Sequence, residues 1–374
     1  MKFIHISDLH LGKRLHETSF IEDQQAILGR ILAIIDAEDP LGVLIAGDIY
    51  DKSTPSAEAV ALFDFFLAEL AKRRLEVFII SGNHDSPERI AFGSKIMNGV
   101  GIHLSPVYDG EIVPTTLKDE YGDVDVYMLP FVKPSHVRRF YQDEAIESYT
   151  DAVRVAVDKM HVDASKRNVL VTHQFVTGAT RSESEETVGG TDNVDASVFE
   201  AFDYVALGHL HRPQFCAGVK IRYSGTPLKY SFSEAADEKS VTVVTLGKKG
   251  EGPEIRTVAL HPVRDMRKIR GTFDALINSA ERTEDYVQII LTDEDDIPNA
   301  MSRLQIIYKN ALDLKYDNTR TRTEAVILGA GETERKPPFE LFAEFFADRN
   351  NAEMSETQKA YMKNLIEKIE EEEA

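Results

Sequence analysis

The chain has 374 residues, more than one hydrophobic core usually serves, so two or three domains are expected. Hydrophobic residues make up 43% and charged residues 28%, a balance that excludes long disordered segments. The formal net charge of −20 argues against a simple DNA-binding protein with a basic surface. Bound metal ions or a partner subunit would have to supply the positive charge that meets a phosphate backbone.

No run of about eighteen apolar residues occurs, and the first ten residues lack the pattern of a secretory signal. We therefore expect neither a membrane span nor a cleaved leader. Cys216 is the only cysteine, which excludes an intrachain disulfide and fits a reducing compartment. These features predict a cytoplasmic protein.

Residues 1–262 alternate short β-branched runs with amphipathic stretches. Helices are predicted over Ile21–Asp36 and Ser56–Arg74, the second capped by Thr54 with Pro55 in its first turn. The strand candidates are Lys2–Ser7, Val43–Ala46, Val77–Ser81, Val126–Leu129, Val169–Thr172 and Tyr204–Leu207. Several are apolar throughout, as expected for strands covered on both faces. The alternation predicts an α/β sandwich flanked by helices.

The pattern changes after Val263. The predicted elements there are a helix over Phe273–Ala280, a strand over Tyr286–Thr292, a helix over Pro298–Tyr308, and strands over Leu312–Tyr316 and Glu324–Leu328. This is enough for a small α+β module, and Gly329–Pro338 is expected to be a linker. The sequence thus divides into a first domain of residues 1–262, a capping domain of residues 263–335 and terminal helices in 336–374.

Two helices are predicted between Phe339 and Glu373. The first carries phenylalanines on one face, and Ser355 with Gln358 forms a capping box for the second. An apolar face for a partner would be formed by Phe339, Phe342, Phe346, Leu365 and Ile369. Alternatively, these side chains pack on the chain's own body.

Five short blocks carry the residues suited to chemistry. They are Asp8-Leu9-His10, Gly47-Asp48, Gly82-Asn83-His84-Asp85, Thr172-His173-Gln174 and Gly208-His209-Leu210-His211. Each block lies at or just after the C-terminal end of a predicted strand, where ligands bind in open α/β sheets. A histidine such as His173 would by itself more often be a core residue, but five blocks together favour a shared site.

The residue types in these blocks favour metal binding. Imidazole, carboxylate and amide groups without a thiolate suit Mn²⁺, Fe²⁺ or Zn²⁺. Seven candidate ligands exceed the needs of one ion, so two ions are expected. Asp48 follows a glycine that permits close backbone approach, and it is the candidate bridge between them.

In this order the blocks resemble the signature of the calcineurin-like metallophosphoesterases. His5–Gly12, Gly47–Asp51, Ser81–Asp85 and Ala206–His211 resemble more closely the SbcD family of bacterial exonuclease subunits. The resemblance implies a metallophosphoesterase β-sandwich. It implies that the first metal ion binds Asp8, His10, Asp48 and His211. It implies that the second ion binds Asp48, Asn83, His173 and His209. His84 would remain unligated and would be the catalytic acid near the leaving 3′ oxygen.

The same resemblance implies a Mn²⁺-dependent DNA nuclease active in DNA end processing, replication, repair and recombination. Such an enzyme cuts single strands and hairpins internally. With an SMC-like ATPase partner, SbcC, it degrades duplex ends 3′–5′ in an ATP-dependent reaction, as a homodimer within a heterotetramer. The alternative is a stand-alone metal-dependent phosphatase or nucleotide phosphodiesterase. The module after residue 262 favours the nuclease branch, and Lys52 after Asp51 fits the protein phosphatases poorly.

Several remaining residues have open assignments. The candidates for DNA contacts are Lys13, Arg14, Lys133 and Arg138, with Arg139, Arg181, Lys220 and Arg222 as further basic residues. Any one of them is as well explained by a scattered surface charge. Asp51 either orients a ligand or belongs to a turn, whereas Asp85 is expected to be a structural acceptor in a turn.

Overall fold

The computed structural model describes residues 1–181, 192–279, 282–319, 321, 338–350 and 353–372. The predicted strand over 324–328 lies outside these residues, as does the predicted linker up to residue 337.

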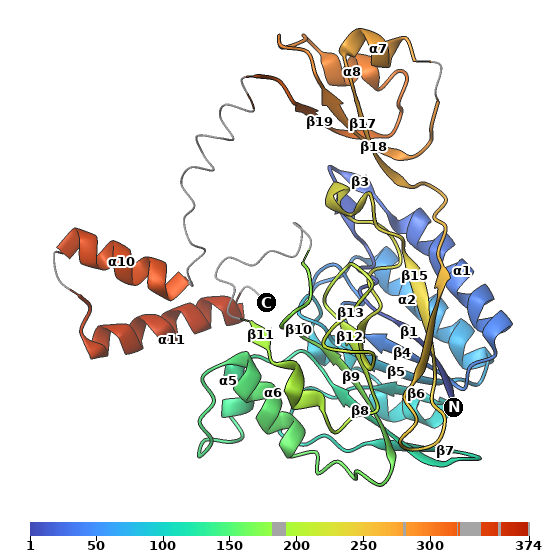
Figure 1. The fold of residues 1–374 in the computed structure, drawn as a ribbon, viewed down its shortest axis with the longest axis vertical. Helices are drawn as coiled ribbons and strands as arrows, with labels where there is room; N and C mark the ends of the chain where they lie inside the picture. The colour runs from blue at the N-terminus through green and yellow to red at the C-terminus, as the bar shows by residue number, and fades with distance from the viewer. Residues whose placement is uncertain (182–191, 280–281, 320, 322–337, 351–352, 373–374) are drawn as a thin grey trace.

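Two six-stranded sheets face each other in the first part of the chain (Figure 1). The first has the order β16 (Glu254–Ala259), β15 (Ser240–Thr245), β1 (Lys2–Ile6), β4 (Gly42–Ala46), β5 (Glu76–Ile80) and β6 (Ile102–Leu104). The second has the order β13 (Gln214–Phe215), β14 (Ile221–Tyr223), β12 (Tyr204–Gly208), β9 (Arg167–His173), β8 (Gly122–Leu129) and β7 (Thr115–Asp119). In both sheets the central strands are parallel, so their carboxyl ends reach the same edge.

Three apolar layers hold the sandwich together. The layer between the sheets includes Phe3, Phe78, Val171 and Tyr204, all fully buried. A second layer packs the first sheet against α1 (Ile21–Glu38) and α2 (Ala57–Lys72). A third packs the other sheet against α5 (Pro134–Arg138) and α6 (Tyr149–Asp158). The predicted α/β sandwich with flanking helices is therefore confirmed.

The predicted cap of α2 was wrong. Ser56 has the extended backbone of an N-cap, and its side chain accepts a hydrogen bond from the Ala59 amide at 3.2 Å. Thr54 lies too early in the chain to reach the first turn, so Ser56 takes the role. The helix α1 also continues two residues beyond its predicted end, to Glu38, where Asp39 adopts a left-handed conformation.

Short elements complete the first part of the chain. They are β2 (Arg14–Leu15), β3 (Thr18–Ser19), α3 (Pro87–Ile90), α4 (Ser94–Met97), η1 (Asn98–Val100), β10 (Phe175–Val176), β11 (Asn193–Val194), η3 (Ala196–Phe199) and η4 (Phe232–Glu234).

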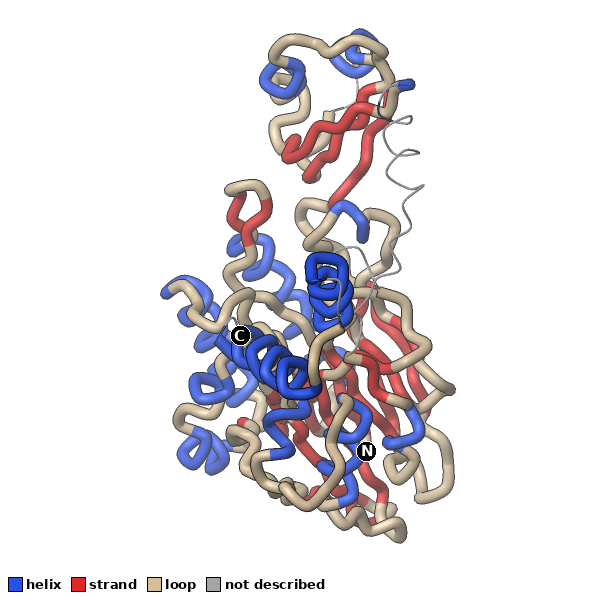
Figure 2. Tube along the Cα trace, turned by 90° about the vertical axis from the view of Figure 1, so that its left-hand side faces the viewer, coloured by secondary structure: helices blue, strands red, loops and turns tan. Residues whose placement is uncertain are grey.

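A smaller unit, here called the capping module, spans residues 266–316. Its parallel strands β17 (Met266–Gly271), β18 (Tyr286–Leu291) and β19 (Ala311–Tyr316) carry α7 (Phe273–Ile277) and α8 (Ala300–Leu304). Both helices are shorter than predicted. The module has its own core, and Figures 1 and 2 show it at one end of the sandwich.

The terminal helices α10 (Pro338–Asn350) and α11 (Glu356–Glu372) pack against each other. The predicted capping box is confirmed: the Ser355 amide donates to Gln358 Oε1 at 2.9 Å, and the Gln358 amide donates to Ser355 Oγ at 3.4 Å. Among the described residues, no helix combines the length and apolar composition that crossing a bilayer requires.

Candidate metal centre

The seven predicted ligands meet at one edge of the sandwich, here called the rim. Asp8 and His10 follow β1, Asp48 follows β4, and Asn83 follows β5, all in the first sheet. His173 ends β9, and His209 and His211 follow β12, both strands of the second sheet. Because the parallel strands of both sheets end here, five segments far apart in sequence deliver side chains to one place.

The backbone of the rim is unusual. Asp8, His10, Asp48 and His209 all have positive φ angles, between 44° and 104°. Such residues need support from their surroundings. The Asp8 amide donates to the Gly47 carbonyl and the His10 amide to the Asp48 carbonyl, each at 3.0 Å. The first two ligand loops are therefore fixed against each other.

Three glycines of the predicted blocks allow the loops to approach closely. A Cβ atom at Gly47 would collide with the His173 ring, one at Gly82 with the Asp48 carboxylate, and one at Gly208 with the Ala46 carbonyl. A side chain at any of these positions would push a ligand or its strand out of place.

Asp48 lies between two groups of ligands. Its Oδ2 atom is 3.7 Å from His10 Nε2 and 3.4 Å from His173 Nε2. Its Oδ1 atom accepts a hydrogen bond from the His84 amide at 2.9 Å. A carboxylate in this position is suited to bridge two ions.

One group consists of Asn83, His173 and His209 beside Asp48. Asn83 Oδ1 lies 3.0 Å from both His173 Nε2 and His209 Nδ1. His173 Nδ1 contacts the Ala46 carbonyl at 2.8 Å, which turns Nε2 toward the other ligands. Three donor atoms thus converge on a common point.

The other group contains His10 and Asp8, with His211 beside them. Ligand atoms of Asp8, His10 and Asp48 all lie within 4.8 Å of one another, and the His10 and His211 ring centroids are 5.1 Å apart. His10 is buried, and neither ring nitrogen has a hydrogen-bond partner among the described residues. A buried imidazole of this kind is satisfied by a metal ion, so the donor set fits divalent cations.

Burial and mutual charge govern ionisation at the rim. Burial raises the pKa of Asp8 to about 6 and lowers the pKa of His10 well below its ordinary value. Burial also acts to lower the pKa of His173, but the adjacent Asp48 carboxylate outweighs it and raises that pKa to about 9. These shifts favour a charged His173 beside a charged Asp48 when no ion is bound. A divalent ion would replace the proton on His173, so metal binding should release protons.

His84 and Asp85, which follow Asn83 in the same block, lie in different surroundings. The side chain of His84 is exposed, its ring lies 5.0 Å from that of His10, and its Nδ1 contacts the Asp51 carbonyl at 3.0 Å. Asp85 is buried and accepts hydrogen bonds from the amides of Ile49, Tyr50 and Gly82 at 2.9–3.0 Å. The expected role of Asp85 as a turn acceptor is confirmed.

Asp51 has a partner that the sequence did not suggest. Its carboxylate pairs with Lys13 at 2.7 Å, and one of its ligand atoms lies within 4.8 Å of His10 and His84. It therefore lies beside the proposed ligands, in a bend of the chain.

Several supporting side chains were not predicted. Gln24 on α1 donates to the His10 carbonyl at 2.7 Å and to Tyr230 Oη at 2.9 Å. Glu234, fully buried, contacts His211 Nδ1 at 3.0 Å and pairs with Lys239 at 2.6 Å. Gln24 is a polar residue on the buried face of a predicted helix, and this position could have indicated its supporting role. No sequence pattern links Glu234 to His211.

The predicted DNA-contact residues have different surroundings. Lys13 pairs with Asp51, and the exposed Arg14 donates to the Glu17 carbonyl. Arg138 donates to the Ile146 carbonyl at 2.9 and 3.1 Å, whereas Lys133 lines a cavity next to Asn83. Arg222, one of the further basic residues, is buried, so a surface role for it is wrong.

The predicted partner face is partly enclosed. Phe339, Phe342, Phe346 and Leu365 are half-buried, and Lys363 lies over the Phe339 ring at 5.2 Å. Phe345 is 58% exposed. The side chain of Ile369 lies outside the described residues.

Comparison with known proteins identifies the family of the chain. Residues 1–213 match the calcineurin-like phosphoesterase family. Residues 262–350 match the type 5 capsule protein repressor C-terminal domain. The chain is 34% identical over 322 residues to the SbcD subunit of the nuclease SbcCD from Staphylococcus saprophyticus, covering 84% of each protein. The chain belongs to the SbcD family of calcineurin-like phosphoesterases.

Solved structures related to this SbcD-family chain are more distant. A protein of Thermus thermophilus is 11% identical, with a TM-score of 0.41. The match covers 68% of this chain and 98% of the Thermus thermophilus chain. A dimetal phosphatase from Danio rerio is 13% identical, with a TM-score of 0.40, and covers the same shares of the two chains.

Proposed function

We propose that this chain is a DNA nuclease subunit that hydrolyses phosphodiester bonds with two divalent ions. The observation that carries the proposal is Asp48, whose carboxylate lies between two groups of nitrogen and oxygen atoms that are buried or half-buried. The relationship to a protein named as a subunit of the nuclease SbcCD supports DNA as the substrate.

The chemistry divides among the residues of the rim. Asp8, His10, Asp48 and His211 would hold one ion. Asp48, Asn83, His173 and His209 would hold the other. When bound, the ions supply an activated water and stabilise negative charge on the phosphate. The resident ions are proposed to be Mn²⁺, which the mixed imidazole and oxygen donors accept.

His84 is proposed as the catalytic acid. Its exposed ring stands beside His10 at the mouth of the site, where a phosphate oxygen can reach it. The contact between its Nδ1 and the Asp51 carbonyl favours the tautomer with a proton on Nδ1 and leaves Nε2 for another partner. In the protonated ring, Nε2 can donate a proton to the leaving 3′ oxygen.

The rest of the chain is proposed to regulate access. Residues 1–262 would form the nuclease domain, 263–335 the capping domain, and 336–374 the attachment site for an SMC-like ATPase, SbcC. On the pair of helices α10 and α11, the exposed side chains of Phe345 and Tyr361 add aromatic surface for such a partner. With the ATPase, the subunit would degrade duplex ends 3′–5′, and alone it would cut single strands and hairpins. A cytoplasmic location follows from this proposal.

Two copies are proposed to pair within a heterotetramer. The segment that contains α4 and η1 exposes Phe92, Ile96 and Val100 at 85%, 81% and 55%. Such a concentration of apolar surface is typical of an interface between subunits. A Phe92→Glu and Ile96→Glu double variant should be a monomer in light scattering, whereas a wild-type chain that is itself monomeric would contradict the pairing.

The substrate is tested by offering two phosphoesters to one preparation. The chain with Mn²⁺ should cut a DNA hairpin and should lose that activity in EDTA. Hydrolysis of a small phosphodiester without any cutting of DNA would contradict the nuclease proposal and favour a stand-alone phosphodiesterase.

Removal of residues 336–374 tests the attachment site. The truncated chain should no longer co-purify with the ATPase, and the Phe345→Ala variant should bind it more weakly. Undiminished ATPase binding by the truncated chain would contradict the assignment.

A further inference from the structure

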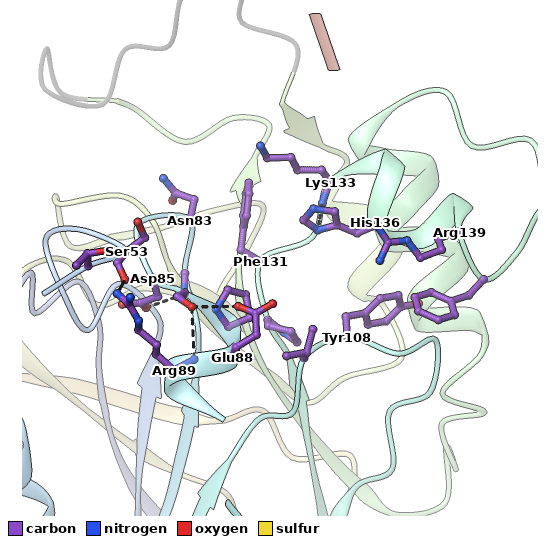
Figure 3. A pocket seen from close by; sticks show the side chains of 17 residues that line it. Ser53, Asn83, Asp85, Glu88, Arg89, Tyr108, Phe131, Lys133, His136 and Arg139 are labelled. Carbon is purple, nitrogen blue, oxygen red and sulfur yellow. Dashed lines mark hydrogen bonds between the residues drawn. The ribbon is translucent and has the colours of Figure 1, made fainter. Parts of the chain in front are cut away.

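A cavity of roughly 500 Å³ opens directly beside the metal centre (Figure 3). Asn83, a proposed ligand, forms part of its wall. The opposite side comes from the segment after β8 and from α5. Its volume falls within the range of about 300–1,000 Å³ that is usual for ligand pockets. None of the roles described above uses the aromatic side chains that line this cavity.

One wall of the cavity is aromatic. Phe131 stands between Asn83 and Lys133 in Figure 3, and its ring centroid is 6.3 Å from that of His173. Its amide donates to the Ser81 carbonyl at 3.0 Å, which fixes this segment to the loop that carries Asn83. Elsewhere in the lining, the rings of Tyr108 and Phe140 meet edge to face, with their centroids 5.8 Å apart. Phe140 is 42% exposed, so it offers an accessible ring.

The margin of the cavity is basic, in a chain of net charge −20. Lys133, His136 and Arg139 lie along and beside α5, and Arg89 lies across from them. The two acidic residues in the lining, Asp85 and Glu88, already accept hydrogen bonds from other groups of the protein. Asp85 accepts three backbone amides, and Glu88 accepts a hydrogen bond from Ser86 Oγ at 3.0 Å.

Aromatic rings beside basic groups, next to a phosphate-hydrolysing centre, are the features that bind unpaired nucleic acid. A base can stack on such rings only when its face is free, and inside a duplex both faces are covered by neighbouring bases. A fully paired duplex could therefore use the basic margin but not the aromatic wall.

We propose that this cavity binds one unpaired nucleotide of the strand whose phosphate is cut. Its base stacks on the wall formed by Phe131, Tyr108 and Phe140. An adjoining phosphate meets Lys133 and Arg139. This inference rests on the proposed nuclease function and adds to it the residues that would hold an unpaired base beside the phosphate that is cut.

The test uses Phe140→Ala and Arg139→Ala, which lie away from the ligands. Matched controls are Phe65→Ala on α2 and Arg30→Ala on α1, both exposed and outside the cavity lining. Dissociation constants are measured by fluorescence anisotropy in EDTA, where nothing is cut. The probes are a labelled single-stranded DNA oligonucleotide and the duplex of the same sequence.

Each cavity variant should weaken single-strand binding about five- to fiftyfold, the range expected for loss of one stacking or phosphate contact. Phe140→Ala should leave duplex binding within about twofold. The two controls should match the wild type on both probes. An oligonucleotide with abasic sites should bind the wild type more weakly, and Phe140→Ala should then add little, because both changes remove the same contact.

The outcomes separate this inference from the nuclease proposal. If the wild type cuts the hairpin while both cavity variants bind single strands as their controls do, the cavity assignment is overturned and the nuclease stands. Equal losses on single strand and duplex for Phe140→Ala would also overturn it, because stacking would not be the cause. If the wild type hydrolyses only a small diester, the nuclease proposal itself fails.

Discussion

The rim and the capping module are built in opposite ways. The rim takes its proposed ligands from five strands of two sheets, between residues 8 and 211, and the loops after β1 and β4 are fixed against each other. The capping module is one three-stranded sheet with two helices and a core of its own. The rim therefore depends on long-range assembly of the sandwich, whereas the module is held by contacts within a short stretch of chain.

A small joint connects the two regions. Asp23 on α1 is buried and accepts hydrogen bonds from Tyr286 Oη and from the Arg264 guanidinium, each at 2.7 Å. The Phe20 and Tyr286 rings lie 4.7 Å apart. Gln24, the next residue on α1, holds the His10 loop. The joint and the rim therefore share one helical turn.

The Asp48→Asn variant should disable the rim and leave the capping module intact, which is the largest contrast expected between the two regions. Loss of the bridging charge should reduce DNA cutting by about a thousandfold or more, because both groups of ligands share that carboxylate. Calorimetric titration with Mn²⁺ should show the loss of tight binding, and the capping module should keep its hydrogen-exchange protection. Asp64→Asn, on the exposed face of α2, is the control. Normal cutting by the Asp48 variant would refute the bridge.

His84→Gln should separate catalysis from metal binding. The variant should retain its ions, since the imidazole is not among the proposed ligands, yet cut DNA about 10²–10⁴-fold more slowly. Metal content by mass spectrometry and single-turnover cleavage would measure the two effects. The exposed His16 gives the matched His→Gln control. A wild-type rate in the His84 variant would remove the catalytic role.

Glu234→Gln tests the support behind the rim. Its carboxylate orients His211, so the variant should bind Mn²⁺ about 10–100-fold more weakly. Activity should return at high Mn²⁺ concentration, because His211 itself is still present. A variant that had lost a metal ligand would recover less activity. Glu238→Gln, exposed and four residues away, should behave as the wild type. Unchanged affinity in the Glu234 variant would mean that His211 needs no such orientation.

Asp23→Asn should act on the joint and have the smallest effect. The free energy of unfolding should fall by about 1–3 kcal/mol, because Arg264 and Tyr286 lose a charged acceptor. Hydrogen exchange should accelerate in β17, while β1 stays protected. Glu22→Gln is the control, since Glu22 contacts Arg264 but is largely exposed. Faster exchange in both strands would show that the joint also supports the rim.

The sequence predicted the rim better than its surroundings, for a physical reason. Each ligand lies in a short block at a strand end, so local pattern and sheet geometry together identify it. The supports Gln24 and Glu234 contact residues 14 and 23 positions away, and only the folded chain brings them together. The cap of α2 was misplaced because Thr54 and Ser56 are both good caps, and the path of the preceding loop decides between them.

The layer of large side chains between the sheets has a further consequence. Phe3, Phe78 and Tyr204 fill that layer and are fully buried. Each proposed ion would bind side chains from both sheets, so a slide of one sheet over the other would pull apart the residues that are to hold it. A close-packed interior resists such shear. These aromatic residues therefore hold the two sheets in place, and with them the side chains that meet at the rim.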